Sequence, residues 1–121
     1  MSTARQRLGA FGEEVATRRL RELGYRVVER NYRCAAGEID VVAMDGEVMA
    51  FVEVRTRRGD RMGTPEESVG PRKQRKMIEV AQTYVAERGY TGAWRLDVVA
   101  VALDERGRVV RCEVIPNAVE G

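Results

Sequence analysis

The period of the hydrophobic pattern changes along the chain, and these changes limit the folds that it can adopt. Apolar residues recur at helical spacing over residues 3–23, and Gly24 ends this helix. A second helix opens at Ser68 and Pro71 and ends at Gly89. Alternating β-branched runs predict strands at 25–31, 38–44, 48–55, 94–103 and 109–115. The predicted order of elements is therefore αβββαββ.

This order predicts an α/β fold in which helices flank one mixed central sheet. Asp45-Gly46 forms the turn between the second and third strands, and residues 56–70, rich in Arg, Gly, Thr and Pro, form a long loop. The second helix serves as a crossover, so that the fourth strand runs parallel to an earlier one. A chain of 121 residues is long enough for one core but not for two, so we expect a single domain over residues 1–121.

The absence of histidine removes several classes of active site. Histidine-dependent triads, zinc sites and nucleases cannot be built from this chain. Cys34 and Cys112 lie far apart without partnering ligands, which excludes zinc and redox motifs and favours a reduced, cytoplasmic protein. No apolar run is long enough for a signal peptide or a membrane span, so no membrane partner is expected. Catalysis would therefore rest on carboxylates, cations, hydroxyls or a metal held by oxygen.

Acidic and basic residues are segregated along the chain, although the formal net charge is only +2. Residues 37–54 carry five acidic side chains and no basic one, whereas 1–36 carry eight basic against four acidic, and 55–76 carry eight against three. Arginine outnumbers lysine by 19 to two. This bias fits either the composition of the genome or phosphate recognition, because the planar guanidinium binds phosphate oxygens in pairs.

The acidic segment contains a hairpin that gathers carboxylates. With the two-residue loop predicted above, Glu38 lies opposite Glu53. Asp40 then lies opposite Phe51, and side-chain alternation brings four groups onto one face: Glu38, Asp40, Glu53 and Arg55. A divalent cation, Mg²⁺ or Mn²⁺, would compensate the repulsion between the carboxylates. The alternative is that Glu38 pairs with Arg55 or a neighbouring arginine and that nothing binds.

An aspartate followed on the next strand by Glu-x-basic is the arrangement of the PD-(D/E)xK nucleases. The chain carries it as Gly37-Glu38-Ile39-Asp40 and Phe51-Val52-Glu53-Val54-Arg55. Further motifs along the chain are Gly12-Glu13, Gly24-Tyr25, Asn31-Tyr32-Arg33, Lys73-Gln74 and Arg95-Leu96-Asp97-Val98-Val99. This ordered set resembles the YraN-type family of small bacterial proteins, which has the restriction-endonuclease-like fold and is similar to archaeal Holliday-junction resolvases.

The resemblance implies a metal-dependent active site. Asp40 and Glu53 would bind Mg²⁺ or Mn²⁺ with the Val54 carbonyl, and Glu13 would add a carboxylate through water. Glu38 is either a further metal ligand or a residue that contacts the ligands without touching the metal. The implied chemistry is metal-assisted hydrolysis of phosphodiester bonds.

One position departs from the superfamily pattern. Arg55 stands at the catalytic position where that pattern has lysine. Arginine can hold the scissile phosphate, but it cannot act as a general base because it stays protonated. Lys73 or Lys76, on the second helix, could take the place of the missing lysine in space.

Cations also gather at the start of the second predicted helix, where the helix dipole disfavours them. Free amide groups together with cations at a helix N-terminus predict a phosphate site. The predicted nucleic-acid-binding residues are Arg57, Arg58, Arg72, Lys73, Gln74 and Lys76. The other interpretation is a solvated basic face that acidic neighbours partly neutralise. Any contact with nucleic acid is expected to follow the backbone and to weaken with salt.

Two functions remain open at this point. The first is a metal-dependent endonuclease that acts on DNA, including branched forms. The second is a nuclease-fold module that binds nucleic acid without cutting it, in recombination, repair or RNA handling. The resemblance to resolvases also implies a homodimer, since cutting two strands of a junction needs two sites.

Overall fold

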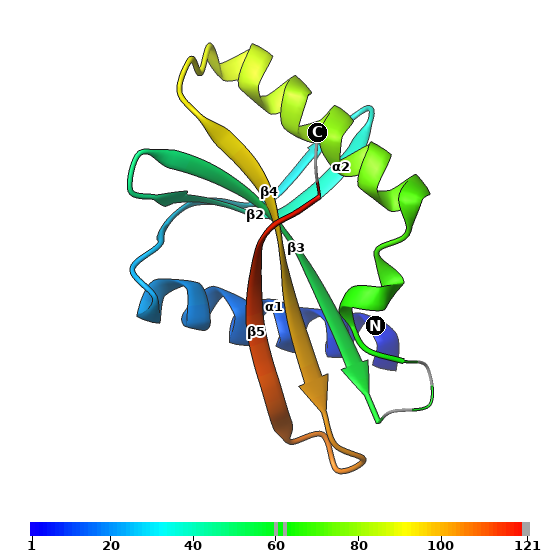
Figure 1. The fold of residues 1–121 in the computed structure, drawn as a ribbon. Helices are drawn as coiled ribbons and strands as arrows, with labels where there is room; N and C mark the ends of the chain where they lie inside the picture. Colours follow the sequence, from blue (N-terminus) through cyan, green and yellow to red (C-terminus); the bar gives the residue numbers. More distant parts are fainter. Residues whose placement is uncertain (60, 62, 120–121) are drawn as a thin grey trace.

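The computed structural model describes residues 1–59, 61 and 63–119, which form two α-helices, a short 3₁₀ helix and five strands. In chain order these are α1 (Ala4–Glu22), β1 (Arg26–Cys34), β2 (Gly37–Asp45), β3 (Val48–Arg58), η1 (Glu66–Ser68), α2 (Pro71–Arg88), β4 (Trp94–Leu103) and β5 (Val109–Val119). The strands form one sheet in the order β1-β2-β3-β4-β5 (Figure 1). β3 and β4 run parallel and the other neighbours antiparallel, because α2 is the crossover between β3 and β4. The predicted α/β fold, with its restriction-endonuclease-like order αβββαββ, is confirmed.

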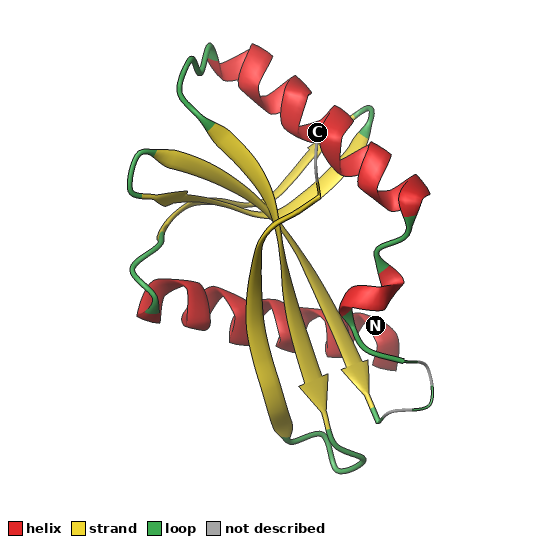
Figure 2. Cartoon of the chain, in the orientation of Figure 1, coloured by secondary structure: helices red, strands yellow, loops and turns green. Residues whose placement is uncertain are grey.

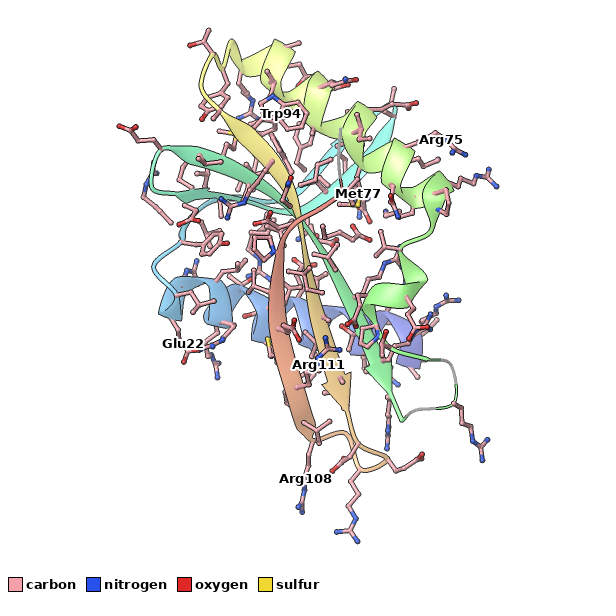
Figure 3. The ribbon with its side chains drawn as sticks, in the orientation of Figure 1. Glu22, Arg75, Met77, Trp94, Arg108 and Arg111 are labelled. Carbon is pink, nitrogen blue, oxygen red and sulfur yellow. The ribbon has the colours of Figure 1, made fainter. Side chains whose placement is uncertain are left out.

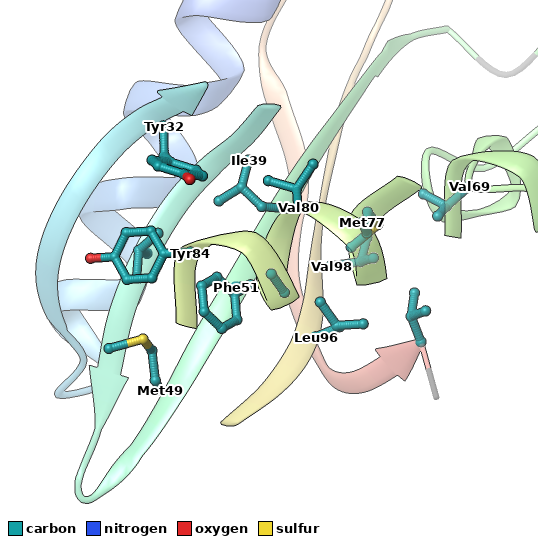
Figure 4. Close-up of a cluster of buried hydrophobic side chains, with 13 residues drawn as sticks. Tyr32, Ile39, Met49, Phe51, Val69, Met77, Val80, Tyr84, Leu96 and Val98 are labelled. Atoms are coloured by element: carbon teal, nitrogen blue, oxygen red, sulfur yellow. The ribbon is translucent and has the colours of Figure 1, made fainter. Parts of the chain in front are cut away.

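The two long helices cover opposite faces of the sheet (Figure 2). On the α1 face, Leu20 packs with the fully buried Val52 and Val99. On the α2 face, the ring of Tyr84 meets Phe51 edge-on, with 5.4 Å between the centroids (Figure 4). Strands buried on both faces have continuous apolar runs, as the sequence shows. Within the described residues, no helix is long and apolar enough to cross a membrane.

Both helices begin and end where local chemistry favours it. The Thr3 hydroxyl accepts a hydrogen bond from the Gln6 N–H at 3.1 Å, and the Gln6 side chain accepts one from the Thr3 N–H at 2.8 Å. α2 begins at Pro71, which has no N–H to leave unpaired, and is followed by Gly89 in the left-handed conformation. The predicted bounds of α1 are confirmed to within one residue, and α2 begins at Pro71 and ends before Gly89 as predicted, whereas Ser68 lies outside it.

The β2–β3 hairpin differs from the predicted register by two positions. Its turn consists of Gly46 and Glu47, because Asp45 is already paired with β3. This register aligns the large apolar side chains of the two strands on the α2 face. The prediction that Glu38 lies opposite Glu53 was therefore wrong, although the shift by an even number of residues keeps the alternation of faces.

The strands extend further than the alternating pattern predicted. β3 continues to Arg58, which pairs with Leu103 of β4, so the connection to α2 is shorter than the predicted loop over 56–70. Positions 60 and 62 of this connection lie outside the described residues. Ser68 belongs to η1 and donates to the Pro65 carbonyl at 2.6 Å, while Gly70 is the N-cap of α2. Charged side chains did not end β3, because pairing with β4 holds its backbone.

α1 approaches β3 very closely at Gly12. A Cβ atom at this position would lie 1.8 Å from the Thr56 Oγ1 atom, well inside any permitted contact. Only glycine allows the helix backbone to lie at this height above the strand. The next residue, Glu13, is consequently held over the part of the sheet where β2 and β3 separate.

Candidate active site

Asp40 and Glu53 meet where β2 and β3 separate. The pairing of the two strands ends at Val41 opposite Val52, one position before these carboxylates. The Val54 N–H donates to Asp40 Oδ2 at 2.8 Å, and Glu53 is only 5% exposed. Burial raises the pKa of Asp40 to about 7, and the adjacent Glu53 carboxyl adds to the rise while the Val54 N–H opposes it. The predicted pairing of these two acids in space is present.

The alternation of β2 side chains between the two faces of the sheet breaks at Asp40. Ile39 packs on the α2 face, whereas Val41, two residues later, packs on the α1 face. The same change occurs on the neighbouring strand at Asn31, whose φ of 55° lies in the left-handed region that asparagine tolerates. Strict alternation, on which the predicted common face of Glu38 and Asp40 depended, therefore fails here. The irregularity leaves the Asp40 carboxyl free to reach the backbone of β3.

Two cations contact the Glu53 carboxylate from different elements. Arg55 Nε lies 3.2 Å and Lys73 Nζ 3.3 Å from Glu53 Oε2. Arg55 follows on the same strand, whereas Lys73 comes from the first turn of α2. A lysine thus reaches the site although the strand itself carries arginine, and the partly buried position of Lys73, 27% exposed, shields the contact from water.

Glu13 faces the same region from α1. Its carboxylate accepts hydrogen bonds from Arg30 at 3.1 Å and from the Asn31 amide at 2.9 Å. Together with Asp40 it lines a cavity of about 580 Å³, which we call the acidic cavity because four carboxylates line it: Glu13, Glu14, Glu38 and Asp40. The negative charge of Glu13 contributes further to the raised pKa of Asp40.

Glu38 is turned toward an arginine rather than toward the other two predicted ligands. Its carboxylate lies 3.0 Å from Arg33 Nε, and the side chain is 47% exposed. Across the part of the chain that the structure describes, no three acidic or cysteine side chains are grouped closely enough to hold a metal ion together. The site consists of the Asp40 and Glu53 pair, with Glu13 at the cavity and Glu38 paired with Arg33.

The predicted nucleic-acid-binding residues divide into two groups. Arg58 donates to the Glu105 carbonyl at 3.0 Å, and Gln74 donates to the Val69 carbonyl at 2.9 Å, so both hold neighbouring loops. The others are Arg57 at the end of β3, Lys73 at Glu53, and the exposed Arg72 and Lys76 on α2. Arg75, also at the start of α2, extends away from the sheet (Figure 3). The basic surface therefore includes fewer residues than the sequence predicted.

Sequence reasoning missed Arg30 and Asn31, which orient Glu13. The signal was an asparagine inside a predicted strand, a residue type that strands disfavour. It also missed the network around Asp97, which is fully buried and receives hydrogen bonds from Arg95 at 2.9 Å and from the Asn117 N–H at 2.8 Å. This network holds β5 against β4 and lies apart from the acidic cavity.

The comparisons with known proteins all lead to one protein family. Residues 12–101 match the family described as "Uncharacterised protein family UPF0102". A UPF0102 protein of Moorella thermoacetica is 49% identical over 119 residues, covering 98% of this chain and 99% of the relative. Another from Pelotomaculum thermopropionicum is 45% identical with the same coverage, and one from Syntrophus aciditrophicus is 43% identical over 98% of this chain and 92% of its own.

Proposed function

Because the chain belongs to family UPF0102, the YraN family that the sequence motifs resembled, we propose that it hydrolyses DNA phosphodiester bonds with a divalent metal ion. The observation that carries this proposal is the half-buried Asp40 carboxyl adjacent to the buried Glu53 carboxylate, with the Lys73 ammonium against Glu53. A buried pair of like charges is costly unless a cation compensates it. Maintaining such a pair is characteristic of active sites.

The residues present fit Mg²⁺ or Mn²⁺. Mg²⁺ is usually bound by one or two protein carboxylates, with waters and substrate phosphate completing its shell. Asp40 and Glu53 would hold it, and burial together with the neighbouring Glu53 and Glu13 carboxylates raises the pKa of Asp40, a strain that a bound cation would relieve. When bound, the ion would lower the pKa of a water molecule and neutralise charge on the phosphoryl group.

The side chains of this protein supply the remaining functions. Lys73 and Arg55 point two cationic donors at the carboxylate pair, where they would hold the phosphoryl oxygens of the scissile bond. Glu13, oriented by two hydrogen bonds, offers acceptor oxygens from α1 for the attacking water. In the reaction the attacking water gives up one proton as its oxygen bonds to phosphorus, the bond from phosphorus to the ester oxygen breaks, and the leaving oxygen takes up one proton.

The test compares DNA forms and active-site variants. Linear, nicked and four-way-junction DNA are incubated with the protein in Mg²⁺, in Mn²⁺ and in EDTA. Cleavage is expected with metal only, and Asp40→Asn and Glu53→Gln should each abolish it. Glu79→Gln, an exposed carboxylate on α2, is the matched control and should cut normally. Preference for the junction would extend the proposal to branched DNA.

Two outcomes would overturn it. Cleavage that persists in both carboxylate variants would come from a contaminating nuclease. DNA binding without cleavage in every metal would favour the second function, a nuclease-fold module that binds nucleic acid without cutting it. Circular dichroism of each variant separates loss of chemistry from loss of folding.

A further inference from the structure

A second, smaller hollow adjoins the acidic cavity and has the opposite charge. It measures about 240 Å³. Its polar lining includes Arg5, Arg55, Arg57 and Ser68, and we call it the arginine hollow. It shares Gly9 and Val54 with the acidic cavity, so the two are neighbours. Among the residues that the structure describes, no carboxylate lines the arginine hollow.

The three arginines of this hollow are poorly neutralised. Among the described residues, the side chains of Arg5 and Arg57 form no ion pair and no hydrogen bond. Arg55 Nε is buried, lies 3.2 Å from Glu53, and still makes no hydrogen bond. Arg55 shares the Glu53 carboxylate with Lys73, whereas Arg5 and Arg57 have no counter-charge among the described residues. An anion in the hollow would offset the repulsion between the guanidinium groups.

The chain brings these arginines together from segments far apart in sequence. Arg5 lies in the first turn of α1, Arg55 and Arg57 lie on β3, and Ser68 lies in η1 just before α2. The start of α1 lies beside η1 at one side of the molecule (Figure 1). Neither α1 nor α2 has an acidic residue in its first turn, although helix N-termini favour negative charge. Neither helix thus places a carboxylate from its own first turn beside the hollow, while η1 carries Glu66, which pairs with Arg111, and Glu67.

We propose that the arginine hollow binds a phosphate group of the nucleic acid, next to the phosphodiester that reacts at Asp40 and Glu53. The proposal rests on the proposed function, because the acidic cavity supplies the reacting position. Guanidinium forks match phosphate oxygens in pairs, and the phosphate would provide the negative charge that the hollow lacks. The phosphate is either an internal or a terminal phosphate of the DNA strand. The two differ only in whether the nucleotide chain continues beyond the phosphate.

The experiment measures binding rather than cleavage. Anisotropy of fluorescein-labelled DNA is recorded in EDTA over a range of salt concentrations for wild type, Arg5→Gln and Arg57→Gln. Each variant should weaken binding several-fold at low salt and should reduce the salt slope by about 0.9, the value of one duplex phosphate contact. Arg18→Gln is the matched control, since Arg18 is an exposed residue of the same helix about 20 Å further along. Arg5→Lys, which keeps the charge, should recover most of the slope.

Oligonucleotides with 5′-phosphate, 3′-phosphate or hydroxyl ends distinguish the two sources of phosphate. A preference of the wild type for one phosphorylated end, lost in Arg5→Gln and Arg57→Gln, assigns a terminal phosphate. Equal losses on all three assign an internal phosphate. Salt slopes of both variants that match those of Arg18→Gln would overturn the proposal, and unchanged melting temperatures ensure that folding is not the cause.

The outcome also separates this proposal from the nuclease proposal. Wild-type protein that binds through Arg5 and Arg57 but never cleaves DNA would support the hollow and refute hydrolysis. Cleavage together with unchanged binding by the arginine variants would refute the hollow alone. Absence of DNA binding by the wild type at low salt would refute both.

Discussion

Arg55 and Lys73 share the Glu53 carboxylate, but they offer different chemistry. A guanidinium stays protonated throughout the physiological range and presents a rigid fork. An ammonium is compact, turns its three donors freely, and can lose its proton when its surroundings favour the neutral form. In the proposed reaction, Lys73 would thus add a compact, freely turning donor beside the rigid fork of Arg55. Under the proposed function, Lys73 on α2 would take the place of the lysine that the nuclease pattern has on β3.

Removing Lys73 should reduce catalysis more than binding. Lys73→Ala is expected to lower the single-turnover rate of DNA cleavage by about 10²–10³-fold, the usual effect of losing one donor aimed at developing charge. Arg75→Ala removes a cation two residues away that extends from the sheet, and should keep the wild-type rate (Figure 3). Equal rates for Lys73→Ala and Arg75→Ala would show that Lys73 has no part in the reaction.

The sequence predicted the pairing of Asp40 with Glu53, and one of its two interpretations of Glu38, a pair with a neighbouring arginine, matches the contact with Arg33. The motif identified the two acids because their spacing belongs to a known arrangement. The position of Glu38 depends on Arg33 across the strand, and that of Asp40 on the left-handed backbone of Asn31. Neither is visible in a rule that assumes regular alternation. A single irregular residue therefore limited the prediction of the site.

At the scale of elements, the packing of α1 on β3 depends on one missing side chain. Gly12→Ala should destabilise the protein by about 1–3 kcal/mol, because its Cβ would overlap Thr56. Gly9→Ala, one turn earlier in the same helix, meets no atom within 4 Å. It should raise stability by up to about 1 kcal/mol through helix propensity. Denaturant unfolding of both variants checks this, and a similar loss in both would point to the helix itself rather than to the contact.

The ion pair between η1 and β5 should make stability depend on pH. Hydrogen bonds from Arg111, labelled on β5 in Figure 3, lower the pKa of Glu66 to about 2. The shortest Arg111–Glu66 contact is 2.6 Å. Because the folded pKa lies below the usual value near 4.5, the contribution is complete above that pH and is lost as pH falls toward 2. With Glu66 29% exposed, we expect it to be worth about 1 kcal/mol.

Urea unfolding of wild type and Glu66→Gln between pH 7 and pH 2 measures this contribution. The difference in the free energy of unfolding should shrink as pH falls below about 4.5. Glu79→Gln, exposed and on α2, should show no such change. A constant difference for Glu66→Gln across the whole range would mean that the pair does not contribute through its charge.

At the scale of the whole molecule, the order of elements was predictable because each helix and strand carries its own hydrophobic period. The parallel pairing of β3 with β4 followed from a helix long enough to cross the sheet. The register of the β2–β3 hairpin was not predictable from its turn residues alone. Contacts with α2 decide it, and Gly46 suits either turn. Local sequence patterns therefore determine the helices and strands, whereas packing against distant segments determines how β2 and β3 align.

The stability of the whole molecule should reveal the metal site independently of activity. Asp40→Asn keeps an oxygen that can accept from the Val54 N–H but removes the repulsion with the buried Glu53. Without metal, the free energy of unfolding should therefore rise by about 1 kcal/mol. Mg²⁺ at about 100 times its Kd should stabilise the wild type by about 2.7 kcal/mol and leave the variant unchanged.

Thermal unfolding with and without Mg²⁺ measures both effects, with Glu79→Gln as the control that should respond like the wild type. If Asp40→Asn kept the full response to Mg²⁺, the ion would bind elsewhere. If the wild type did not respond, the carboxylate pair would lack the cation that the proposed reaction needs. Relative to the wild type, Asp40→Asn should be more stable without metal and less stable with Mg²⁺. This change of sign is expected when two carboxylates are held together to bind an ion, at a cost in stability when the ion is absent.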